Sequence, residues 1–77
     1  MKHKIVFEPY EVGARIQWNW VGGVIQGKIE EVHMGPIEMV IKGSKIKRNG
    51  TVEKPAYLVR SEAGNLALKL HTELKEA

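Results

Sequence analysis

Apolar and polar residues alternate along most of the chain after residue 12. In the segment 15–20, RIQWNW, the apolar side chains Ile16, Trp18 and Trp20 occupy every second position. This is the period of a strand that buries one face. The pattern therefore predicts a half-buried strand over residues 15–20, with both tryptophans on its buried side.

Gly22-Gly23 follows this strand and predicts a tight hairpin turn, after which residues 24–29 return. A turn at these two glycines would pair Trp20 with Ile25, Trp18 with Gly27, Ile16 with Ile29 and Arg15 with Glu30. In that register the ring of Trp18 lies over the bare backbone of Gly27. Beyond Ile29 the apolar positions change parity, which predicts a bulge near Glu30-Glu31.

Two more hairpins are predicted further along. Residues 37–41 pair with 45–48 around Gly43-Ser44, which places Lys42 opposite Lys45. Residues 57–61 then pair with 66–70 around the turn 63–65, and the tail has room for one helical turn at most. Five or six short antiparallel strands with almost no helix indicate a small barrel or two orthogonal sheets.

The chain has 77 residues, which is enough for one domain and one core. We expect an N-terminal arm or edge strand over residues 1–11, with Ile5-Val6-Phe7 as its apolar part, and a single domain over residues 12–77. The thin margin of stability of so small a domain favours a shallow surface site over an enclosed cleft.

Three motifs resemble the hypervirulence-associated protein Tudor-like domain family. They are Ile16-x-Trp18-Asn19-x-x-Gly22-Gly23-x-x-x-Gly27-Lys28-Ile29, then Asn49 with Pro55-x-Tyr57-Leu58-Val59, and finally Leu68-Lys69-x-His71-x-x-Leu74. The resemblance runs from about Val12 to Leu74. It implies an all-β, SH3-like (Tudor-like) antiparallel barrel, and it implies no particular ligand or reaction.

The composition argues against catalysis and against bound metal. All nine acidic residues are glutamates, there is no cysteine, and His3, His33 and His71 do not have the spacing of zinc ligands. Neither Ser44 nor Ser61 lies in the setting of an activated nucleophile. We expect no enzyme activity, no cofactor and no metal site. The absence of cysteine and of a long apolar segment favours a cytoplasmic protein that does not enter a membrane.

The aromatic residues suggest a site for a protein or peptide partner on the rim of the barrel, in a monomer or weak homodimer. The candidate residues are Trp20, Asn19, Tyr57 and His71. An aromatic cage for a methylated side chain, built from Trp18, Trp20 and Tyr57 with Tyr10 and Phe7, is a further option. Plain core packing explains the same residues, and we expect Trp18 in the core and Trp20 partly exposed beside the turn.

The net charge is +3, and positive residues concentrate in the second hairpin. Lys42, Lys45, Lys47 and Arg48 could follow a phosphate backbone, which would make this hairpin a weak, sequence-independent nucleic-acid site. Lysines also keep exposed strand edges from pairing with other chains. The sequence leaves both explanations open.

Overall fold

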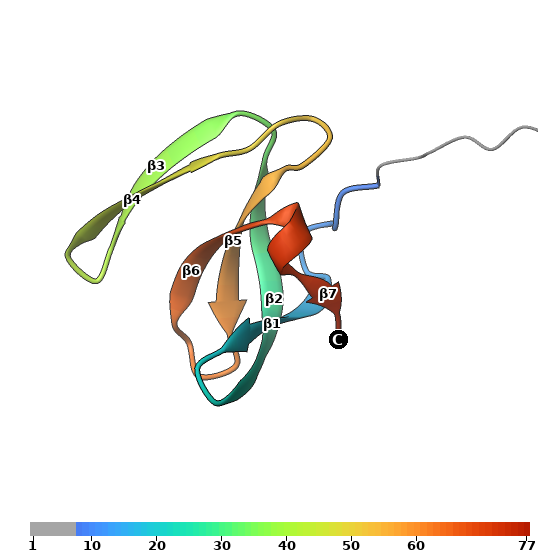
Figure 1. Cartoon of the computed structure of the whole chain (residues 1–77), viewed down its shortest axis with the longest axis vertical. Helices are drawn as coiled ribbons and strands as arrows, with labels where there is room; N and C mark the ends of the chain where they lie inside the picture. Colours follow the sequence, from blue (N-terminus) through green and yellow to red (C-terminus); the bar gives the residue numbers. More distant parts are fainter. Residues whose placement is uncertain (1–7) are drawn as a thin grey trace, which may run out of the picture.

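The computed structural model describes residues 8–77, and these form two antiparallel sheets and no α-helix (Figure 1). The larger sheet has the order β6-β5-β2-β1-β7, and the smaller one pairs β3 with β4. The strands are β1 (Arg15–Trp20), β2 (Gly23–His33), β3 (Pro36–Ile41), β4 (Ser44–Asn49), β5 (Ala56–Ser61), β6 (Leu66–Leu70) and β7 (Lys75–Glu76), with a 3-10 turn η1 (His71–Glu73). The predicted all-β fold is confirmed, and the predicted segment Ile5-Val6-Phe7 lies outside the described residues.

The long strand β2 lets the larger sheet wrap around its core. Its first half pairs with β1 and its second half with β5. Between Ile29 and Glu31 the register with β5 shifts, so the predicted bulge is present at Glu30. A bulge bends the strand and increases its twist, which turns the sheet over the side chains on its inner face.

The inner face of the larger sheet holds the main core. Its buried residues are Ile16, Trp18, Ile29, Tyr57, Val59 and Leu74. Trp18 is 5% exposed, which confirms its predicted place in the core. Half-buried Tyr10 also packs against this cluster, so the chain just before the domain is attached to it.

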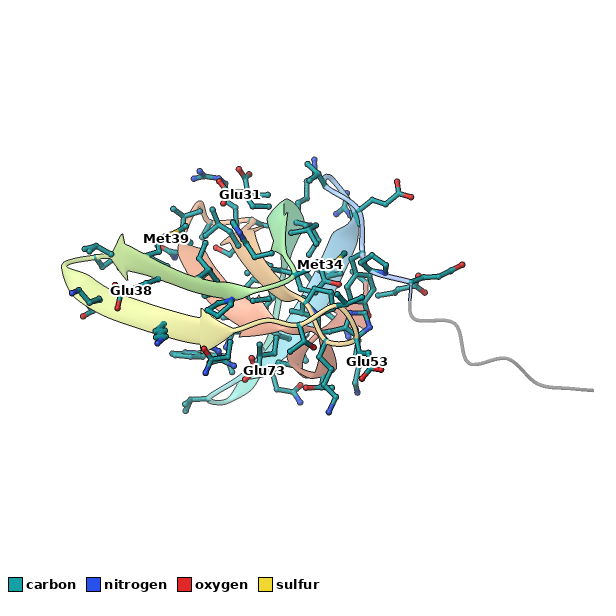
Figure 2. The ribbon with its side chains drawn as sticks, turned by 90° about the horizontal axis from the view of Figure 1, so that it is seen from above. Glu31, Met34, Glu38, Met39, Glu53 and Glu73 are labelled. Atoms are coloured by element: carbon teal, nitrogen blue, oxygen red, sulfur yellow. The ribbon has the colours of Figure 1, made fainter. Side chains whose placement is uncertain are left out.

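A second cluster lies on the opposite face of β5 and β6. There Leu58 and Leu68 pack against Ile41, with Met39 and Ile46 beside them. The hairpin β3–β4 projects from the larger sheet in both views (Figures 1 and 2). The packing of Ile41 with Leu58 and Leu68 holds the tip of this hairpin against β6. Because β5 is covered on both faces, four consecutive residues, 56–59, are buried.

The first hairpin turns one residue earlier than predicted. Trp20 pairs with Gly23, Trp18 with Ile25, Ile16 with Gly27 and Arg15 with Lys28. The turn is Val21-Gly22, and Gly22 has the positive φ (81°) that such a turn requires. Gly23 already belongs to β2, so the predicted contact of Trp18 with Gly27 is wrong.

The second hairpin shows the same displacement of one residue. Its turn is Lys42-Gly43, with φ of 52° and 79°, and Ile41 pairs with Ser44. Lys45 lies opposite Val40, so the predicted like-charge pair of Lys42 and Lys45 is wrong.

Gly27 is required for a reason that the sequence does not reveal. A Cβ atom at this position would overlap the carbonyl oxygen of Arg60 and lie 2.9 Å from the Cα of Ser61. The backbones of β2 and β5 therefore approach too closely here for any side chain.

Candidate functional site

Trp20 is the one tryptophan that the fold leaves on the surface. It lies on the same face of β1 as Ile16 and Trp18, but beyond the end of the core, and it is 60% exposed. Its ring lines a hollow of about 280 Å³ whose other walls include Lys42 and residues 65–67. The ammonium group of Lys69 lies 5.8 Å from the centroid of the ring, within the range of cation-π attraction.

A second hollow, also of about 280 Å³, lies on the other side of Lys69. Asn19 lines it together with Trp18, Thr72, Glu73 and Lys75. Trp18 and Lys69 are common to both hollows. We call this pair of hollows, between β6 and the second half of β1, the seam.

The seam exists because the larger sheet does not close into a complete barrel. Strand β7 pairs with β1 only at Ile16 and Gln17, which leaves the edge of β1 beyond Gln17 unpaired. Strand β6 ends the sheet on the other side. Residues of β1 and β6 therefore line the same hollows without being paired to each other.

The direction of the backbone groups along β6 follows from its hydrogen bonds with β5. The N–H of Ser61 donates to Asn65 (2.8 Å) and the N–H of His71 donates to Pro55 (2.9 Å), so the odd positions of β6 face β5. In an antiparallel pair the intervening residues direct their N–H and C=O groups away. Leu66 and Leu68 therefore direct both groups away from β5, but Leu68 is only 4% exposed, because the second hairpin packs against β6.

Positive charge dominates the lining of the seam. Lys42, Lys69 and Lys75 contribute ammonium groups, and Glu73 is the carboxylate among the lining residues. The side chain of Glu73 is paired with Arg48 of β4 and accepts a hydrogen bond from the N–H of Leu70 (2.7 Å). The seam is thus an electropositive groove with its acidic group already engaged.

The pKa of Glu73 reflects this pairing. Burial alone would raise the pKa of its carboxyl, but the hydrogen bonds from Arg48 and from the backbone of Leu70 bring it below its ordinary value. Glu73 therefore stays ionised and bound to Arg48 at neutral pH. Figure 2 labels Glu73, which belongs to η1.

Tyr57, which we expected on the rim, is fully buried in the core. Its hydroxyl accepts a hydrogen bond from the N–H of Tyr10 (3.0 Å) and is hydrogen-bonded to Nδ1 of His71 (2.8 Å). Burial raises the pKa of this hydroxyl, so it is neutral at physiological pH. The prediction of Tyr57 as a contact residue is wrong, because β5 is the covered central strand.

His71 is half-buried, and its contacts are with this internal cluster. Its ring stacks on that of Tyr10 at 4.8 Å between centroids. Together with the bond to Tyr57, this arrangement attaches the segment before Gly13 to the end of β6. The structure thus gives His71 a role in packing and places it outside the lining of the seam.

The described residues do not assemble an aromatic cage. Trp18 and Tyr57 are buried, Tyr10 packs against Tyr57 and His71, and Trp20 stands alone in a hollow that carries lysines. Phe7 lies outside the described residues. A cage for a cationic ligand needs several converging rings, which this arrangement lacks.

The four positive residues predicted as one basic patch are divided among three places. Lys42 lines the seam, Lys45 and Lys47 share the exposed face of β4, and Arg48 faces the body of the domain in its ion pair with Glu73. Lys47 also lies opposite Glu38. The four residues therefore do not share one surface, since alternate residues of a strand point to opposite faces. Binding of nucleic acid by this hairpin stays a prediction.

Residues 8–77 were compared with the side-chain groupings that hold metal ions and with the helices that cross membranes. This part of the chain contains no group of three or more histidine or glutamate side chains placed to hold a metal ion. No helix within it is long and apolar enough to cross a membrane.

Comparison with known proteins agrees with the fold. Residues 13–74 match the family model described as the hypervirulence associated proteins TUDOR domain. The chain belongs to this family. No curated protein and no solved structure matches the chain. Asn19 and Trp20 both lie within the matched segment, whereas Tyr10 precedes it.

Sequence reasoning missed the part played by Lys69. This residue lies on the inner face of β6, on the same side as Ala67. The apolar residues Leu68 and Leu70 lie on the other face of the strand. A lysine at an inward position of an amphipathic strand is a usable signal of an open or solvated interior. Its contact with Trp20, which comes from a distant strand, had no signal in the sequence.

Proposed function

We propose that this domain is a non-enzymatic binding module that engages a protein or peptide partner through Trp20 and Asn19 at the seam. The observation that carries the proposal is the exposure of Trp20. Tryptophan is highly buried on average, whereas Trp20 is 60% exposed and lines a hollow. Tryptophan is also among the residues most enriched at the centres of binding interfaces. Asn19 lines the second hollow with a side chain able to donate and accept hydrogen bonds.

Replacing Trp20 with alanine is expected to weaken binding strongly without unfolding the domain. An exposed ring contributes little to stability, so the free energy of unfolding should change by less than about 0.5 kcal/mol. Removal of an anchoring tryptophan should weaken binding by about 2 kcal/mol or more. Peptides are selected from a random display library on the immobilised domain, and their affinities are then measured on the variant.

The matched control for this experiment is Val52→Ala. Val52 is an exposed apolar residue in the loop before β5 and does not line the seam. It should leave the affinity of the selected peptides unchanged. Selection of peptides that bind the parent and Trp20→Ala equally well would contradict the proposal.

A second candidate function is weak, sequence-independent binding of nucleic acid through the hairpin β3–β4. It is supported by Lys45 and Lys47, which lie on one exposed face of β4 and form no ion pair within residues 8–77. Arg48 is left out of this candidate, because it is engaged with Glu73.

If the hairpin binds phosphates, affinity for duplex DNA should fall steeply with salt. The double variant Lys45→Glu, Lys47→Glu should lower the slope of log K against log salt by about 2, one unit for each lost phosphate contact. Lys28→Glu, an exposed lysine of β2, is the matched control. A slope that is equal in the parent and the double variant would exclude this surface.

A further inference from the structure

Resting on the proposed function of Trp20, we infer that the first hollow of the seam binds a carboxylate side chain of the peptide partner. Lys42 and Lys69 hold this carboxylate, while an apolar neighbour in the same peptide packs on Trp20. Three observations carry the inference. They are the mixed lining of the hollow, the lack of a carboxylate partner for its two ammonium groups, and the unfavourable backbone conformation of Lys42.

The lining of the first hollow combines apolar walls with positive charge. The apolar walls are formed by Trp18, Trp20, Ile25, Leu66 and Ala67. Lys42 and Lys69 line the hollow as well, and no carboxylate does within the part of the chain that the structure describes. Opposite charges attract more strongly beside apolar walls than in bulk water, because the local dielectric constant is lower. A ligand carboxylate would therefore gain more here than at lysines on an open surface.

Neither ammonium group of this hollow forms an ion pair within residues 8–77. The glutamates of neighbouring segments are engaged elsewhere. Glu62, in the turn between β5 and β6, pairs with Arg15 (3.3 Å), and Glu73, in the second hollow, pairs with Arg48. Lys69 is half-buried, and lysine is seldom buried unless it is paired. A carboxylate supplied by another chain would complete this pairing.

The ring of Trp20 joins the charged and the apolar parts of the hollow. The ammonium group of Lys69 lies 5.8 Å from the centroid of the ring, and this cation-π contact keeps the charge beside the ring. The ring is largely exposed, so it also offers surface to an apolar side chain. An acidic residue and an apolar residue close together in one peptide would meet both features.

The backbone conformation of Lys42 is unfavourable for a lysine. Lys42 and Gly43 form the turn of the second hairpin, with φ of 52° and 79°. A hairpin turn with two positive φ values favours asparagine or glycine at its first position, and lysine seldom adopts this conformation. Departures of this kind from local preference cluster at functional sites. Because Lys42 lines the first hollow, its charge can serve there in a way that asparagine cannot.

The packing of the second hairpin sets the position of Lys42. Ile41 is buried against Leu58 and Leu68, and this contact holds the following turn beside the start of β6. Lys45 lies on the exposed outer face of the hairpin and does not line the hollow. The hairpin thus supplies one ammonium group to the hollow, and Lys45 provides a matched lysine outside it.

The test uses peptides selected from the random display library on the immobilised parent domain and then synthesised with blocked termini. Blocked termini leave acidic side chains as the carboxylates of the peptide. The selected sequences should share an acidic residue close to an apolar one. Replacing that acidic residue by its amide should weaken binding to the parent about thirtyfold, because the amide carries no charge to meet the two ammonium groups.

A double-mutant cycle locates the carboxylate on the domain. Lys42→Asn and Lys69→Met should each weaken binding of the acidic peptide about fivefold, since each removes one of the two ammonium groups. Both variants should bind the amide form of the peptide as the parent does. Lys45→Asn makes the same change on the outer face of the hairpin and should leave both affinities unaltered.

The stability of Lys42→Asn separates a direct contact from a structural role. Asparagine suits the first position of this turn better than lysine, so the midpoint of urea denaturation should rise. A residue that served only to hold the hairpin would not weaken binding when the hairpin becomes more stable. Unchanged affinity of Lys42→Asn and Lys69→Met for the acidic peptide would overturn the inference.

The remaining outcomes separate this inference from the proposed function. Selected peptides that need Trp20 but are neutral or basic would overturn the inference and leave the binding module standing. The absence of any Trp20-dependent peptide would overturn both. Tighter binding of single-stranded DNA than of any selected peptide would overturn the inference in favour of phosphate groups as the bound anions.

Discussion

Gly27→Val is expected to destabilise the domain by about 3 kcal/mol, at the upper end of the usual cost of overpacking. A side chain at this position meets the backbone of β5 at Arg60 and Ser61, and backbone cannot move aside as a flexible side chain can. The two strands would have to separate at the centre of the larger sheet. Urea denaturation of parent and variant measures the loss.

Gly35→Ala is the matched control for this substitution. A Cβ atom at Gly35 would have no neighbouring atom within 4 Å, and the residue does not have a positive φ, so alanine is accommodated without strain. Its stability should stay within about 0.5 kcal/mol of the parent. Equal stability of Gly27→Val and the parent would show that β2 and β5 are further apart than the structure has them.

The alternation of side chains allows the strands and the inner core to be predicted, because it depends only on neighbouring residues. Ile16, Trp18 and Val59 are buried as their positions in the pattern indicate. The bulge at Glu30 is also predictable, since a change of parity appears directly in the sequence. Local signals of this kind need no knowledge of the rest of the fold.

The turns of the first two hairpins differ from their predicted positions because each segment contains two dipeptides that could form the turn. Gly22-Gly23 could hold the turn itself or contribute one residue to it, and Lys42 adopts a left-handed conformation that lysine seldom takes. An error of one residue moves every cross-strand pair. The predicted contact of Trp18 with Gly27 fails for this reason, although the predicted burial of Trp18 does not.

The site is predictable only in part, because its components come together through packing between distant segments. Trp20 is expected at the surface from its place beside the turn, and it is there. Tyr57 is misplaced by the sequence pattern, since β5 is covered on both faces and shows no alternation from which to judge its direction. Lys42 reaches the seam only because the second hairpin folds across β5 and β6.

Trp18→Ala should cost about 3 to 5 kcal/mol, which is most of the stability that a domain of this size usually has. The ring of Trp18 is 5% exposed and packs within the main core, beside Ile16 and Tyr57. It also forms a wall of both hollows, so its loss would join the core cavity to the seam. The variant should be largely unfolded at physiological temperature, as measured by thermal melting.

Trp20→Ala is the matched comparison, because it removes the same ring from the same strand two residues away. The two variants should therefore separate stability from binding. Trp18→Ala loses the fold, whereas Trp20→Ala keeps the fold and loses affinity for the partner. Trp18→Phe should recover part of the stability, since a phenyl ring fills part of the same space. If Trp18→Ala and Trp20→Ala melted together, the two tryptophans would share one environment, and the seam would no longer have an exposed anchor distinct from the core beneath it.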